Sequence, residues 1–178
     1  STCTHNGTHI DTPHHIGVGK KLDEIPLEDL YGDGVVLDMP RGELEKITAA
    51  DLEKAKPEVK ERDIVILNTG WGKLWGKISD ADHKSKRPGI TRDAAEWLVK
   101  KKVKVIGGDI IAIHHPSIKE LDPKVSVHYT LLSNNIVILE CLTNLEKVAG
   151  RRLKIGVFPL PIKEGDGSPV RAVAFLEQ

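Results

Sequence analysis

Residues 63–68 read D-I-V-I-L-N, an apolar and mostly β-branched run that predicts a buried strand. Helices are expected on either side of it, at residues 49–56 after the N-cap Thr48 and at residues 92–102 after the N-cap Thr91. Further strands are predicted at residues 34–39, 103–106, 110–113, 136–139, 154–158 and 170–176, and further helices after Ser126 and Asn144. Strands interleaved with helices, without an internal repeat, predict an α/β domain.

Size and composition narrow the class of protein. The 178 residues fit one domain, and 26 acidic residues balance 26 basic residues. This balance argues against nucleic acid as the main partner. No apolar run approaches the roughly 20 residues that span a bilayer, so no membrane partner is expected. With only Cys3 and Cys141, a reduced, cytoplasmic protein is the preferred interpretation.

Residues 4–15, T-H-N-G-T-H-I-D-T-P-H-H, concentrate four histidines and one aspartate. Imidazole and carboxylate are ligands that zinc, manganese and Fe(II) accept, and general bases are drawn from the same side chains. The stretch is therefore predicted to be a metal site, a proton-transfer site, or both.

The same stretch must bend. Its glycine, threonines and proline disfavour a helix, so an extended or looped chain is expected. In a straight strand of roughly 3.3 Å per residue, His5 and Asp11 would lie about 20 Å apart, too far to bind one ion. Gly7, which tolerates positive φ, is the predicted bend.

The pattern H-x-G-T-H-x-D-x-P-x-H, formed by residues 5–15, resembles the signature of the cyclase family of metal-dependent hydrolases, which includes bacterial kynurenine formamidase and isatin hydrolase. A second family element, a histidine followed twelve residues later by a glutamate, matches His128 and Glu140. Weaker similarities lie at residues 34–39, 68–71 and 107–110. Two elements in the family order, more than a hundred residues apart, argue against a chance match.

The resemblance implies a fold and a ligand set. The fold would be a swivelling β/β/α domain, with a mixed sheet and flanking helices. His5, His9 and Asp11 would hold one divalent ion, while His128 and Glu140 complete a second position, with Asp11 and Glu140 bridging. Two ions per subunit are expected, zinc first and manganese as the alternative, because this ligand set suits several metals.

Other residues of the chain carry weaker expectations. The resemblance makes His15 the catalytic proton-transfer residue, with a hydrogen-bonding role beside the ligands as the alternative. Trp71 is either a substrate-binding wall or a core residue. His14 is expected at the surface. His114 and His115 stand where the family more often has acidic and hydroxyl residues, and they are expected to be structural histidines at a turn.

The implied activity is metal-dependent hydrolysis of a C–N amide bond, with N-formylkynurenine as the first substrate and water activated by the metal. The alternatives are an isatin hydrolase-like lactam or lactone hydrolase, or a non-catalytic binding domain stabilised by metal. Structural zinc sites are usually rich in cysteine, so a ligand set without cysteine favours catalysis. The expected partner is a small amide or lactam, and a homodimer or homotetramer is implied by the resemblance.

The position of the motif in the chain differs from the family pattern. The first motif histidine, His5, follows only four residues, whereas the family usually has several dozen residues before it. Residues 1–178 are therefore expected to be a single hydrolase domain that lacks an N-terminal segment.

Overall fold

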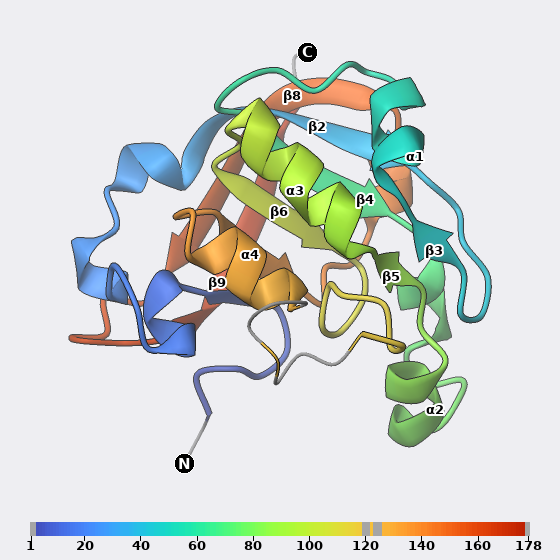
Figure 1. The fold of residues 1–178 in the computed structure, drawn as a ribbon, viewed down its shortest axis with the longest axis horizontal. Helices are drawn as coiled ribbons and strands as arrows, with labels where there is room; N and C mark the ends of the chain where they lie inside the picture. The colour runs from blue at the N-terminus through green and yellow to red at the C-terminus, as the bar shows by residue number, and fades with distance from the viewer. Residues whose placement is uncertain (1–2, 119–121, 123–125, 177–178) are drawn as a thin grey trace.

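The computed structural model describes residues 3–118, 122 and 126–176 (Figure 1). Seven strands form a closed, mixed sheet in the order β1-β7-β6-β4-β2-β8-β9, and β9 pairs back to β1. A separate two-stranded sheet joins β3 and β5. The strands are β1 (His9–Asp11), β2 (Tyr31–Asp38), β3 (Lys46–Ile47), β4 (Ile64–Asn68), β5 (Gly89–Ile90), β6 (Val105–Gly108), β7 (Val137–Glu140), β8 (Arg151–Pro159) and β9 (Gly167–Phe175).

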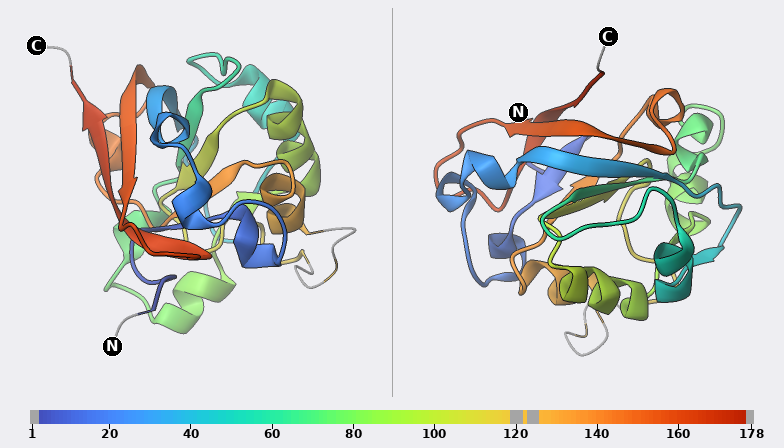
Figure 2. Two further views of the ribbon diagram at one scale, coloured as in Figure 1. Left: turned by 90° about the vertical axis from the view of Figure 1, so that its left-hand side faces the viewer. Right: turned by 90° about the horizontal axis from the view of Figure 1, so that it is seen from above.

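The four α-helices of the described residues are short. They are α1 (Ala49–Lys54), α2 (Asp80–Ser85), α3 (Arg92–Lys101) and α4 (Val127–Leu132), and 3₁₀ turns lie at Pro13–Ile16, Leu22–Glu24, Leu27–Asp29, Trp71–Leu74 and Leu145–Lys147. Figure 2 shows α1, α3 and α4 along one side of the strands, with β8 and β9 on the opposite side. The predicted α/β class and the mixed sheet with flanking helices are confirmed, and the sheet also closes on itself.

β4, the strand of the D-I-V-I-L-N run, is buried along its whole length because both of its faces are covered. Val65 and Leu67 pack in the cluster that includes Leu98 of α3, whereas Ile64 and Ile66 pack in a second cluster among the strands. Parallel pairing joins β2, β4, β6 and β7 in the middle of the sheet.

Two of the three N-caps predicted for α1, α3 and α4 have the expected side-chain bond. Thr48 Oγ1 accepts a hydrogen bond from Asp51 N–H, and Ser126 Oγ accepts one from Tyr129 N–H. Thr91 precedes α3 as predicted, but its hydroxyl donates to the Ile47 carbonyl instead. The cap position was therefore predictable at all three helices, whereas the hydrogen-bond partner of the Thr91 hydroxyl depends on a distant segment of the same chain that packs beside α3.

Several predicted elements need correction. Residues 110–113 do not form a strand, because Ala112 adopts a φ of +54° and the backbone turns away from the sheet. β2, β8 and β9 each begin three residues before their predicted starts at residues 34, 154 and 170, because pairing with a neighbouring strand continues there. The short helix predicted after Asn144 is the 3₁₀ turn Leu145–Lys147.

Two further expectations concern the cysteines and the membrane. Cys3 is exposed, Cys141 is buried, and no disulfide joins them. Burial raises the pKa of the Cys141 thiol to about 12, so this thiol remains protonated near neutral pH. Within the described part of the chain, no helix combines the length and the apolar character that crossing a bilayer requires.

Candidate metal centre

β1 carries two of the predicted ligands next to the strand that carries a third. His9 and Asp11 alternate with Ile10, so they share one face of β1. Antiparallel pairing with β7 places His9 opposite Glu140. Ile10 is fully buried on the other face. This register brings the beginning of the chain to the carboxyl end of β7.

Gly7 provides the predicted bend, with a φ of +62° that is accessible to glycine without steric cost. The bend brings His5 Nδ1 to 2.6 Å from Asp11 Oδ1. It also allows His9 Nδ1–H to donate to the Gly7 carbonyl at 2.8 Å. Because this bond assigns a proton to Nδ1 of His9, its Nε2 is the ring nitrogen available to a metal ion.

Asp11 lies between the other candidate ligands. Its two carboxylate oxygens lie 3.5 Å from His9 Nε2 and 3.6 Å from His128 Nε2. Glu140 lies 3.8 Å from His9 Nε2 and 3.5 Å from His128 Nε2. Two ligand atoms about 2.1 Å from a tetrahedral ion are about 3.4 Å apart, close to these separations. The side chains form two groups, His5–His9–Asp11 and Asp11–His128–Glu140, which share Asp11.

The Glu140 carboxylate is held in place by two backbone N–H groups. Ala112 N–H donates to Oε2 at 2.8 Å, and Ile113 N–H donates to Oε1 at 3.0 Å. One donor on each oxygen fixes the carboxylate plane and stabilises its negative charge. The irregular backbone of residues 110–113, which the sequence did not predict, therefore supports the site directly.

Charge balance also fits a cation at this position. Asp11 and Glu140 are only 2% and 4% exposed. Burial favours the protonated form of Asp11, but hydrogen bonds with His128, His5 and His9 outweigh burial and hold its pKa below the usual range. The hydrogen bond to Asp11 raises the pKa of His5 to about 9, although burial opposes this shift. In the metal-free protein, protons on the histidines thus balance buried carboxylates, and a divalent cation can supply that positive charge instead.

All of these side chains face one cavity of about 720 Å³. The cavity is lined by the five candidate ligands and by His15, Ile16, Lys84, Arg87, Ile111, Ala112, His114, Ser126 and Tyr129. The volume lies within the range that holds a small organic molecule. The donor set, the separations and the charge balance therefore fit a divalent metal centre that is open to a small substrate.

His15 lies on the 3₁₀ turn Pro13–Ile16, beside the candidate ligands. Its ring centroid is 4.2 Å from that of His5 and 6.4 Å from that of His128. Its side chain is 36% exposed, so it lies at the mouth of the cavity. His14, the neighbouring histidine, is half-buried and does not line the cavity.

Trp71 lies in the core and not on the wall of this cavity. It is 6% exposed, and its indole N–H donates to the His83 carbonyl at 3.0 Å. It belongs to the cluster beneath α3. Of the two alternatives for Trp71, this placement favours core packing over a substrate wall.

His114 and His115 have different environments. His115 is 4% exposed, and its ring bonds the Leu44 carbonyl and Ser117, as expected of a structural histidine. His114 lines the cavity, its ring lies edge-to-face with His128 at 5.1 Å, and its Nε2 accepts a hydrogen bond from Arg87 Nη2 at 3.0 Å. The expectation of two structural histidines therefore holds for His115, whereas His114 belongs to the cavity.

Sequence reasoning did not single out three residues of the site, Asp166, Lys84 and Arg87. Asp166 lies in the loop before β9, and its Oδ2 is 2.9 Å from His5 Nε2. In the sequence, G-D-G-S-P signals only a turn, and no spacing rule connects it to residues 5–15. Lys84 lies in the last turn of α2, and Arg87 lies just after this helix. Basic residues are expected at the C-terminal end of a helix on electrostatic grounds alone, so their positions did not indicate a site.

Comparison with known proteins identifies the family of the chain. The model of the family described as "Putative cyclase" matches residues 1–115. A kynurenine formamidase of Bacillus thuringiensis is 33% identical, over 95% of this chain and 75% of that protein. An isatin hydrolase of Roseibium aggregatum is 30% identical, over 97% of this chain and 72% of that protein.

Solved structures give the same result. The crystal structure of an isatin hydrolase bound to the product analogue thioisatinate matches with a TM-score of 0.85 and 26% identity, over 100% of this chain and 74% of that one. A structure described as a potential metal-dependent hydrolase with cyclase activity matches with a TM-score of 0.78 and 26% identity, over 98% of this chain and 80% of that one. The chain is therefore a member of the cyclase family and, like these relatives, a hydrolase.

Proposed function

We propose that this hydrolase cleaves the C–N bond of a small aryl amide, with N-formylkynurenine as the first candidate substrate. The observation that carries the proposal is the convergence of His9 and Asp11 of β1, Glu140 of β7 and His128 of α4 in one cavity. The similarity to kynurenine formamidase supports the choice of substrate.

In this proposal, His5, His9 and Asp11 hold one divalent ion, and Asp11, His128 and Glu140 hold a second. Zinc is the first candidate and manganese the alternative, because imidazole and carboxylate bind both. When bound, such an ion makes water more acidic and polarises the amide carbonyl.

The protein contributes a site whose donors are already oriented. The Gly7 carbonyl fixes the His9 ring through Nδ1, and two backbone N–H groups fix the Glu140 carboxylate. Metal-binding side chains that are hydrogen-bonded by surrounding groups keep their orientation when the ion binds. The site therefore needs little rearrangement of His9 and Glu140 to bind a cation.

His15 is proposed as the catalytic proton-transfer residue. It lies at the cavity mouth next to His5, where it can take a proton from the nucleophilic water and return it to the leaving nitrogen. Imidazole suits both steps because each ring nitrogen can accept or donate.

The basic side chains of the cavity favour a substrate that carries a carboxylate. Lys84 and Arg87 both line the cavity, and Lys84 is exposed, so its ammonium group can meet a substrate carboxylate. N-formylkynurenine has a carboxylate outside its reacting amide, whereas isatin is neutral. The alternative, an isatin-type lactam or a lactone, rests on the similarity to isatin hydrolase.

The test begins with the purified protein stripped by a chelator. We expect hydrolysis of N-formylkynurenine to be lost and then restored by zinc or manganese, with lower kcat/KM on isatin. Unchanged hydrolysis without any metal would overturn the metal dependence. Preference for isatin would select the alternative substrate class.

A metal-stabilised binding domain is the alternative without catalysis. It predicts a large drop in thermal stability when metal is removed and no turnover of formanilides, lactams or lactones. Turnover of any of these substrates by the metal-loaded protein excludes it.

The remaining proposals rest on the family resemblance. We propose a swivelling β/β/α arrangement, a single domain over residues 1–178 and a homodimer or homotetramer, and the two cysteines, which form no disulfide, favour a cytoplasmic location. Light scattering of the purified protein tests the oligomeric state.

A further inference from the structure

We propose that Asp166 is a positioning residue that holds both the metal ligand His5 and the proton-transfer residue His15. This inference rests on the proposed function for the roles of those two histidines. Asp166 matches neither of the two sequence motifs, and it reaches the site from the loop before β9.

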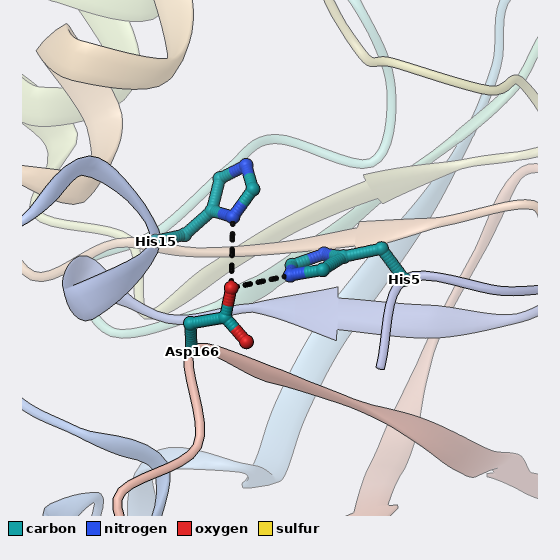
Figure 3. Close-up of side chains that lie close together, drawn as sticks. All are labelled: His5, His15 and Asp166. Atoms are coloured by element: carbon teal, nitrogen blue, oxygen red, sulfur yellow. Dashed lines mark hydrogen bonds and ion pairs between the residues drawn. The ribbon is translucent and has the colours of Figure 1, made fainter. Parts of the chain in front are cut away.

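One carboxylate oxygen serves both rings (Figure 3). Asp166 Oδ2 lies 2.9 Å from His5 Nε2 and 3.5 Å from His15 Nδ1. The other oxygen, Oδ1, accepts a hydrogen bond from Thr4 Oγ1 at 3.2 Å. Asp166 therefore bridges the two histidines, whose ring centroids are 4.2 Å apart.

The backbone fixes Asp166 at this point. Thr12 donates two hydrogen bonds to the Asp166 carbonyl, from N–H and from Oγ1, each at 3.0 Å. The next residue, Gly167, pairs with Asp11 across β1 and β9. A Cβ at Gly167 would lie 2.5 Å from the Ile10 carbonyl oxygen and 2.6 Å from the His5 ring, so only glycine leaves room for that ring.

The contact determines which nitrogen of His5 faces the metal. His5 Nε2 faces Asp166, and His5 Nδ1 faces Asp11. A carboxylate that accepts from Nε2–H keeps the proton on Nε2 and makes Nδ1 the nitrogen available to a cation. Asp166 thus assigns the tautomer in which His5 can bind an ion together with His9 and Asp11.

The same carboxylate orients His15. Because Asp166 lies on the Nδ1 side of the His15 ring, Nε2 is the nitrogen left for proton transfer with the substrate. Both effects act through histidines, so Asp166 is expected to influence metal affinity and kcat without binding the ion itself.

The experiment compares Asp166→Ala and Asp166→Asn with the control Glu164→Gln. Glu164 lies in the same loop, and its exposed side chain pairs with Lys21. Metal-free protein is titrated with zinc against a competing chelator, and the His5 tautomer in the zinc-loaded protein is read from ¹⁵N shifts. We expect Asp166→Ala to weaken zinc affinity about 10- to 100-fold and to lower kcat at saturating zinc, as for other outer carboxylates. Asp166→Asn, which keeps one acceptor oxygen, should lie between Asp166→Ala and the wild type, and Glu164→Gln should match the wild type.

The outcomes separate this inference from the proposed function. Weaker zinc binding in Asp166→Ala, with the wild-type stoichiometry, supports the inference even if no amide is hydrolysed. Unchanged zinc affinity and an unchanged His5 tautomer would overturn it. Loss of one bound zinc would also overturn it, because Asp166 would then be a ligand in the group His5–His15–Asp166.

Discussion

His9 of β1 lies directly opposite Glu140 of β7, in the antiparallel register that also pairs Ile10 with Leu139. Because successive side chains of a strand point to opposite faces, a shift by one residue would turn His9 into the core and Ile10 into the cavity. Ile10 and Leu139 are fully buried, so the packing of the barrel selects the register that assembles the site. The arrangement of the candidate metal centre is thus a consequence of apolar packing on the opposite face of the same strand.

Replacing Glu140 by glutamine should destabilise the metal-free protein. The two Glu140 oxygens each accept one backbone N–H, from Ala112 and Ile113, and a glutamine has only one oxygen. One of these N–H groups would then face an NH₂ group, at a cost of about 1–3 kcal/mol in the free energy of unfolding. Urea denaturation measures the change, and Glu146→Gln in the exposed turn after β7 is the control. Equal stability of the two variants would contradict the two backbone hydrogen bonds to the Glu140 carboxylate.

The pair Asp63–Arg152 should contribute more to stability than the neighbouring pair Asp33–Lys154. Arg152 bonds both oxygens of Asp63, at 2.8 and 2.9 Å, and Asp63 is 2% exposed. Arg152→Met leaves this buried carboxylate without its cation, and we expect a loss of about 3 kcal/mol, at the low end for buried pairs because Arg152 is partly exposed. Lys154→Met breaks an exposed pair and should change the free energy of unfolding little. Urea denaturation measures the free energy of unfolding of both variants. Similar losses in the two would show that burial of Asp63 does not determine how much the Asp63–Arg152 pair contributes to stability.

Much of the fold could be predicted from local sequence, because β4 and α3 depend on local patterns. The apolar run of β4 and the residues after Thr91 specify their elements without information from distant parts of the chain. Residues 110–113 were predicted wrongly for the same reason. Their isoleucines favour a strand locally, but bonding to Glu140 requires a turn that only the folded chain reveals.

The candidate site also combines features that local sequence predicts with features that depend on distant parts of the chain. The spacing from His5 to Asp11 already required a bend, and Gly7 supplies it. Asp166 could not be predicted, because its contact with His5 depends on the pairing of β9 with β1 that closes the barrel. Trp71 was equally ambiguous, since its position beneath α3 is set by contacts with His83 on a different segment.

His83 should make the fold less stable in mild acid. Its side chain is 1% exposed and stacks on Trp75 at 3.7 Å, and within the described residues neither ring nitrogen has a hydrogen-bond partner. Burial lowers its pKa below 6.5, although the contact with Trp71 and the nearby Asp109 and Asp80 oppose the shift. Below pH 6.5 the unfolded chain takes up a proton more readily than the folded protein, so stability is retained above this pH and falls as the pH decreases through the folded pKa.

The variant His83→Phe keeps an aromatic ring for stacking on Trp75 and removes the titrating group. We expect the decrease in the urea midpoint between pH 7.5 and pH 5.5 to be smaller in His83→Phe than in the wild type. Each unit of pKa difference corresponds to about 1.4 kcal/mol. Because the other histidines are common to both proteins, an identical decrease in both would assign the acid sensitivity elsewhere.

Lys84 should recognise the carboxylate of the substrate. Its side chain is exposed and lines the cavity that holds the candidate ligands, whereas Lys86, two residues later, pairs with Asp82 and does not line it. Lys84→Met should raise KM for N-formylkynurenine about fivefold, because an exposed charge pair contributes up to about 1 kcal/mol and 1.4 kcal/mol corresponds to tenfold. KM for formanilide, which has no carboxylate, should stay constant, and kcat for both substrates should change little. Lys86→Met is the matched control and should behave as the wild type. A parallel rise in KM for both substrates would show that Lys84 shapes the cavity and does not recognise charge, and high salt should weaken only the effect on N-formylkynurenine.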